Sequence, residues 1–159
     1  MKTLSYDKLC QLSREALASP RLRMNSNFHP QLSDPIQRLA IAMEPGTYIR
    51  PHRHSATWEL LSPLRGRFVV LTFDDAGQVS QRAVLGEDVS AVEIPQAGWH
   101  AVLSLDVGAS ILEVKRGPYA PFRAEDFAPW SNDLNEDAQA SLMACYRHAQ
   151  IGQRWEKSA

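Results

Sequence analysis

The sequence contains little cysteine, few aromatic residues and no excess of charge of either sign. Only two of its 159 residues are cysteines, 8% are aromatic, and the formal net charge at pH 7 is −1. Cys10 and Cys145 lie near opposite ends of the chain, which favours free thiols over a disulfide framework. A nearly neutral chain without a block of basic residues is not typical of proteins that bind nucleic acids.

Long hydrophobic segments are also missing. No apolar run approaches the ~20 residues that a membrane-spanning helix requires. Residues 1–8 contain an early acid and no apolar stretch, unlike a signal peptide. We therefore expect a cytoplasmic protein that has neither a membrane nor a nucleic acid as its partner. With 159 residues, 44% of them apolar, the chain should form one domain over residues 1–159 with a sizeable core.

The pattern of hydrophobic residues predicts an all-β domain flanked by two helices. A capped amphipathic stretch that stops before Pro20 predicts a helix at about 5–18, and an acidic first turn predicts another at about 135–150. Strands are expected at about 21–29, 36–43, 47–54, 57–63, 67–73, 78–85, 90–95, 99–105 and 109–116. Many short strands separated by turn signals are typical of a sandwich or barrel, here followed by an aromatic-rich wrap over residues 117–132.

Two histidines separated by one residue, with a glutamate soon after and a distant third histidine, form the most informative motif. His52 and His54 would share one face of a strand, because side chains alternate between the two faces. Glu59 lies on the next expected strand, and His100 can come from a strand across the barrel. Imidazole and carboxylate groups suit one divalent transition metal ion such as Zn, Fe, Mn or Ni, so we predict that these four residues bind it. The alternative is a pair of surface histidines, with Glu59 paired to an arginine.

Several other polar residues are candidates for binding or transforming a substrate beside this metal. The candidate substrate-binding residues are Arg21, Arg23, Asn25, Asn27, Arg50, Lys115 and Tyr48, and the candidate catalytic residues are Glu113 and His29. The alternating polar residues of segment 21–29 suit an anionic, hydroxyl-rich ligand such as a sugar phosphate, or else they belong to an edge strand that faces water. Glu113 and Lys115 share one face of the last strand. Facing inward they would be an acid and a base beside the metal, and facing outward only a surface ion pair.

The spacing of the histidine motif resembles the first signature of the cupin superfamily without departure. It reads Gly46, five residues, His52-x-His54, four residues, Glu59, six residues and Gly66. The second signature is matched less well. Pro95 and His100 have the expected separation, but Gly98 lies one place late, and Val89 and Ser104 replace the expected glycine and asparagine. The resemblance implies a single cupin barrel, which is a double-stranded β-helix or jelly roll.

A narrower resemblance covers about residues 19–130. These residues look like the WbuC-type cupin-fold metalloproteins, named for members found in O-antigen (surface polysaccharide) gene clusters. The match is carried by the stretches 19–29, 44–54, 58–59, 93–95, 98–100, 113–115, 117–119 and 127–130. This resemblance implies one metal in a β-barrel, a homodimer, and a role in O-antigen biosynthesis or related polysaccharide metabolism.

Three functional hypotheses remain open at this point. The first is a metal-dependent enzyme, such as an isomerase or epimerase, that acts on a small anionic or carbohydrate (sugar-nucleotide-like) substrate. The second is a non-catalytic cupin that binds a sugar or metabolite, in which the metal anchors the ligand or stabilises the fold. The third is an Fe(II)-dependent dioxygenase, which would differ from the other two by consuming oxygen.

Overall fold

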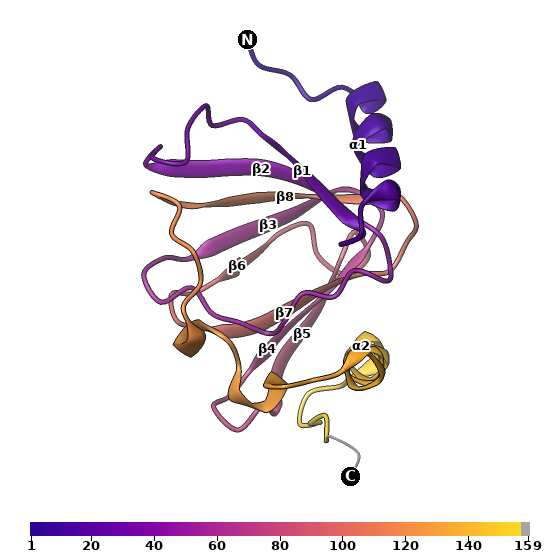
Figure 1. The fold of residues 1–159 in the computed structure, drawn as a ribbon, viewed down its shortest axis with the longest axis vertical. Coiled ribbons are helices and arrows are strands. Elements are labelled where there is room, and N and C mark those ends of the chain that lie inside the picture. The colour runs from indigo at the N-terminus through magenta and orange to yellow at the C-terminus, as the bar shows by residue number, and fades with distance from the viewer. Residues whose placement is uncertain (157–159) are drawn as a thin grey trace.

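The computed structural model describes residues 1–156, which form two antiparallel β-sheets and two α-helices (Figure 1). The five-stranded sheet has the order β1 (Arg23–Asn27), β2 (Ile36–Met43), β8 (Ala109–Arg116), β3 (Glu59–Arg65) and β6 (Val92–Ile94). The three-stranded sheet has the order β5 (Val79–Leu85), β4 (Phe68–Phe73) and β7 (Trp99–Ser104). The expected mostly β architecture with two helices is therefore present, and it is consistent with a cupin jelly roll.

The two sheets face each other, and each has a helix against its outer side (Figure 1). Helix α1 (Tyr6–Ala18) packs against β1 and β2, where Leu12 meets the small side chains of Ala40 and Ala42. Helix α2 (Glu136–His148) packs against β7. Its Leu142 and Tyr146 join an apolar cluster with the outer face of the three-stranded sheet.

Alternation along β4 explains why this strand is apolar at every position except Thr72. Val69 and Leu71 belong to the cluster under α2, whereas Phe68 and Val70 belong to the cluster between the two sheets. Successive side chains of a strand point to opposite faces, so a strand that is covered on both sides needs apolar residues at every position. The cluster between the sheets fills one end of the barrel, where it includes Ile111 of β8.

Both helices begin close to the expected residues because a side chain caps each of them. The hydroxyl of Ser5 accepts a hydrogen bond from the Lys8 amide at 3.1 Å, and the side chain of Asn135 accepts one from the Ala138 amide at 2.9 Å. Such caps satisfy amides that have no partner within the helix. Two short 3-10 helices, Ala124–Asp126 and Pro129–Ser131, interrupt the expected aromatic-rich wrap. Within residues 1–156 there is no helix long and apolar enough to cross a membrane.

Most of the expected strands are present, but one is not. The strands β2 and β8 have the expected bounds, and β1 is shorter than the stretch 21–29. The expected strand at 47–54 is wrong, because in this segment only His52 forms isolated bridges, one to His100 and one to Phe127. The segment joins no ladder, so side-chain alternation does not apply to it.

The glycine that ends the first histidine motif lies where two turns come close. Gly66, between β3 and β4, has a φ of +70°, and a Cβ placed on it would lie 2.8 Å from the Cβ of the buried Ala109. Gly108, between β7 and β8, also has a φ of +70°, but a Cβ there would come no closer than 3.8 Å to Ser13. Both positions favour glycine for conformational reasons, and only Gly66 is also crowded.

We predict that Gly66→Ala lowers the free energy of unfolding by about 1–3 kcal/mol more than Gly108→Ala does, because only the first substitution adds a clash with Ala109. Both variants carry the cost of an alanine at positive φ, about 1–2 kcal/mol, so the comparison isolates the crowding. Urea denaturation of the two variants measures the difference. Equal losses would show that the approach to Ala109 costs nothing.

Candidate functional site

Two of the three histidines of the motif are joined through their backbones. The amide of His52 donates to the carbonyl oxygen of His100 at 3.0 Å, and the amide of His100 donates to the carbonyl oxygen of His52 at 2.9 Å. This pair of hydrogen bonds places the segment 47–54 beside β7. The two imidazole rings consequently lie close together, with centroids 4.3 Å apart.

His54 completes a group of three imidazoles that could hold a metal ion. Its ring centroid lies 5.3 Å from that of His52 and 5.6 Å from that of His100. One ring nitrogen from each histidine lies within 4.8 Å of the others. The rings therefore converge as the sequence motif suggested, although the segment that carries His52 and His54 is not a strand.

Backbone carbonyl oxygens determine which ring nitrogen of His52 and of His100 can bind a metal ion. Nδ1 of His52 lies 2.8 Å from the carbonyl oxygen of Arg50, and Nδ1 of His100 lies 2.9 Å from that of Gly98. A carbonyl oxygen can only accept, so each Nδ1 carries the proton and each Nε2 presents a lone pair. Burial lowers the pKa of His52 to about 3, which keeps this imidazole in the neutral form that binds metals.

Glu59, at the start of β3, contacts His54 and His100. Its carboxylate oxygens lie 3.1 Å from Nε2 of His54 and 3.2 Å from Nε2 of His100. The contact with His100 does not meet hydrogen-bond geometry, and Nε2 of His100 is buried without a hydrogen bond within residues 1–156. A lone pair that faces a carboxylate in a buried position calls for a cation between them. Three imidazoles and a carboxylate fit a divalent transition metal, and the role of Glu59 as a direct ligand stays a prediction.

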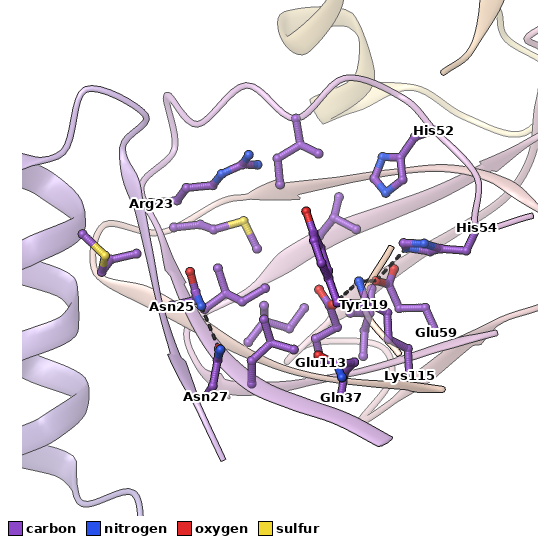
Figure 2. Close-up of a pocket in the computed structure, with 18 of the residues that line it drawn as sticks. Arg23, Asn25, Asn27, Gln37, His52, His54, Glu59, Glu113, Lys115 and Tyr119 are labelled. Atoms are coloured by element: carbon purple, nitrogen blue, oxygen red, sulfur yellow. Dashed lines mark hydrogen bonds and ion pairs between the residues drawn. The ribbon is translucent and has the colours of Figure 1, made fainter. Parts of the chain in front are cut away.

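A cavity of about 270 Å³ opens beside the three histidines (Figure 2). Arg23, Asn25 and Asn27 lie on one side of it, and His52 and His54 lie on the other. Between these two walls the lining is mostly apolar and comes from Leu39, Ile41, Met43, Ile49, Leu61, Val102 and Ile111. The volume is near the lower end of the range for small-molecule sites, about 300–1,000 Å³.

The alternating polar residues of the segment 21–29, which includes β1, face this cavity. Arg21, Arg23, Asn25, Asn27 and His29 all line it. Met24 also borders the cavity, but it packs against the cluster under α1. Strand β1 is an edge strand, as the alternative interpretation held, and Asn25 and Asn27 remain exposed. These residues therefore form the mouth of the cavity.

His29 is buried at the same wall. Its Nδ1 lies 3.0 Å from the backbone amide of Arg38 and 3.0 Å from the carbonyl oxygen of the same residue. Its Nε2 is buried and has no hydrogen-bond partner within residues 1–156. The ring is thus held by β2 and is shielded from solvent, which makes His29 a wall residue more than a free acid or base.

The last strand, β8, points two of its three charged residues inward. Glu113 and Lys115 both line the cavity, and Nζ of Lys115 lies 2.6 Å from Oε1 of Glu113 and 3.6 Å from Oε1 of Glu59. Burial and the charge of Glu59 raise the pKa of Glu113 to about 7. Burial alone would lower the pKa of Lys115, but the charges of Glu113 and Glu59 raise it above its usual value. A charged ammonium and a carboxyl group with a pKa near 7 therefore stand next to the histidines.

Two expected binding residues lie elsewhere. Arg50 was expected to share the cavity, but its guanidinium hydrogen-bonds to Ser131 at 3.0 Å and to Asn132, and it lies 4.6 Å from the ring centroid of Phe127. Tyr48 packs against the apolar cluster under α2. Both expectations are corrected. The one for Arg50 relied on side-chain alternation with His52, and the segment 47–54 forms no strand.

Two cavity residues were not foreseen from the sequence. The Phe122 ring lies 4.6 Å from the ring centroid of His52 and 5.2 Å from that of His54. Gln37 of β2 is buried and lines the cavity, where its amide donates to the carbonyl oxygens of Leu32 and Asp34. A glutamine within an apolar strand was a signal for an inward polar position, whereas nothing in the sequence indicates that Phe122 returns to the histidines.

Comparisons with known proteins identify a family and a fold. A family model described as a domain of unknown function (DUF6016) matches residues 4–85. No curated protein matches the sequence. Among solved structures, a cupin 2 domain-containing protein from Halorhodospira halophila is 16% identical with a TM-score of 0.51, and the match covers 82% of this chain and 85% of that one.

Two further solved structures are similar at the same level. The protein TT1209 from Thermus thermophilus is 19% identical with a TM-score of 0.52, and the match covers 73% of this chain and 97% of that one. An oxalate oxidase in complex with the substrate analogue glycolate is 14% identical with a TM-score of 0.51, over 65% of this chain and 55% of the oxidase. The chain thus spans about half of that enzyme. At these identities the similarity shows the cupin fold.

We predict that His54→Ala weakens Zn(II) binding by at least about 100-fold, because the substitution removes one of three converging imidazoles. His148→Ala is the matched control, since His148 is exposed at the end of α2. Competition with a chelator measures the affinities, and circular dichroism confirms that both variants are folded. Equal Zn(II) affinity in the two variants would contradict the assignment of the metal centre.

Proposed function

This chain belongs to the family described as a domain of unknown function (DUF6016), and we propose that it is a cupin-fold metalloenzyme acting on a small anionic or carbohydrate-like substrate. The observation that supports this proposal is the composition of one cavity. Three converging imidazoles, the buried Glu113–Lys115 pair and two arginines all line it or border it. A metal that served only to stabilise the fold would not need an acid–base pair and cationic side chains around the same space.

His52, His54 and His100 would hold the metal, with Glu59 beside them. A bound divalent ion supplies an electrophilic centre that can polarise a carbonyl group or activate water. The tautomers of His52 and His100 are set by the backbone carbonyls described above, so both rings are oriented before any ion arrives.

Glu113 is the residue best placed to move a proton. Its carboxyl group, with a pKa near 7, can both take up and release a proton at neutral pH. Nζ of Lys115, 2.6 Å away, can donate to the Glu113 carboxylate or to a substrate oxygen. Such a pair suits an isomerisation or epimerisation, in which a proton leaves one carbon and returns to the same or a neighbouring carbon. His29, which was a second candidate, is engaged at Nδ1 and shielded at Nε2.

The resemblance to WbuC-type proteins is what suggests a cellular context. It supports polysaccharide-related metabolism and a homodimer, which are associations and not mechanisms. The cavity of about 270 Å³ favours a small metabolite over an entire nucleotide sugar.

The proposed reaction class is tested with metal-loaded protein and a panel of keto acids, hydroxy acids and sugar phosphates. We expect at least one member to be converted, as followed by NMR, without consumption of oxygen. Glu113→Gln should lower the turnover number by about 10²–10⁴-fold with unchanged metal content, because the variant cannot carry the proton. Glu93→Gln, an exposed position on β6, is the matched control and should retain full turnover.

Two outcomes would contradict this function. Full metal occupancy with no conversion of any panel member would favour a binding module. Oxygen consumption that depends strictly on Fe(II) would favour a dioxygenase. Equal turnover in Glu113→Gln and in the unaltered chain would remove Glu113 from the mechanism.

A further inference from the structure

The most unusual charges in the cavity belong to Arg21 and Arg23. Both line the cavity, and neither guanidinium has an ion pair or a hydrogen bond to any residue of 1–156. Arg23 is half-buried, and burial together with the charge of Arg21 lowers its pKa. The charge of Glu113 acts in the opposite direction on Arg23, and Arg21 is exposed to water, but within residues 1–156 no carboxylate pairs directly with either guanidinium. An anion bound between the two guanidiniums would offset their mutual repulsion.

The other charges of the cavity are already balanced. Lys115 is paired with Glu113 at 2.6 Å and with Glu59 at 3.6 Å. Glu59 also lies within 3.2 Å of His54 and His100, where it would offset part of the charge of a metal. The positive charge that no carboxylate pairs with therefore lies at the mouth of the cavity, where Arg23 stands opposite His52 and His54 (Figure 2).

Between these two ends much of the cavity wall is apolar, although Gln37, Glu113 and Tyr119 also line it. Leu39, Ile41 and Met43 of β2 line it together with Leu61, Val102 and Ile111. A sugar would place some of its hydroxyl groups against these apolar side chains and leave those hydroxyls without hydrogen bonds, which is costly. A short hydrocarbon segment would instead be buried favourably there.

We propose that the ligand is a short acid, with one anionic group held by Arg21 and Arg23, an apolar middle, and an oxygen donor at the far end directed to the histidine centre. This inference rests on the proposed metal centre and narrows its substrate to organic acids over carbohydrates. A guanidinium can bind a carboxylate through two parallel hydrogen bonds, which fixes the direction of the acid in the cavity. The small cavity volume sets an upper limit of a few carbons between the two ends.

Linear dicarboxylates of increasing length test this arrangement with the Zn(II)-loaded protein. Isothermal titration calorimetry with malonate, succinate, glutarate and adipate should show an affinity that peaks at one length. Butyrate, with a single carboxylate, and glucose 6-phosphate should bind at least about tenfold more weakly than the best dicarboxylate. The same dicarboxylate should also lose at least about tenfold in affinity when the Zn(II) is removed, because one of its two contacts is then missing.

Variants at the mouth separate the arginine contact from the metal contact. Arg23→Ala should lower the affinity for the best dicarboxylate by at least about tenfold. Arg23→Lys should lower it by less, because lysine keeps the positive charge but not the planar guanidinium that forms two parallel hydrogen bonds. Both variants should bind Zn(II) like the unaltered chain. Arg116→Ala is the control, since Arg116 is exposed and lines a second, outer cavity of about 560 Å³.

The possible results divide clearly. If the chain binds no Zn(II), the metal centre itself is wrong. If Zn(II) binds but the dicarboxylates do not, or they bind equally well to Arg23→Ala, the short-acid inference is overturned and the metal centre stands. A loss of dicarboxylate affinity in Arg116→Ala alone would also overturn it, because the acid would then occupy the outer cavity.

Discussion

The reciprocal pair of hydrogen bonds between the backbones of His52 and His100 is the contact on which the site depends. It fastens an irregular segment to β7 and brings together two rings that lie 48 positions apart in the sequence. Each ring then donates its Nδ1 proton to the carbonyl oxygen two residues earlier, so both Nε2 atoms are left as ligands. Glu59 and His54 can complete a metal centre only because this pair is already in position.

The second constraint is the direction in which the short edge strand β1 turns its polar residues. Met24 packs toward α1, so alternation sends Arg23 and Asn25 to the cavity side. The interior of the barrel is consequently divided. One end is a packed apolar core, and the other is a cavity with cationic groups at its mouth and histidines at its far wall. Because the two ends of the cavity carry different groups, a ligand can bind in one orientation only, which a uniformly polar cavity would not impose.

Much of this arrangement follows from patterns that strands impose on a sequence. The pattern of buried residues predicted the strands β2 and β8. Capping residues predicted the starts of the helices, and the spacing of the motif predicted that the histidines converge. The orientations of Tyr48 and Arg50 were not, since the segment 47–54 forms no ladder and alternation has no meaning there. The approach of Phe122 to the histidines was also not predictable, because it depends on the path of the irregular stretch after β8. Inward placement of Glu113 was left open by a strand with apolar residues on both faces.

The central claim is that three imidazoles from distant parts of the chain bind one ion. X-ray absorption spectroscopy of the unaltered, Zn(II)-loaded protein tests it most directly. The account predicts a first shell of nitrogen and oxygen atoms at about 2.0–2.1 Å with the outer-shell scattering pattern of three imidazole rings. A first shell made only of oxygen atoms, with no imidazole scattering, would contradict it.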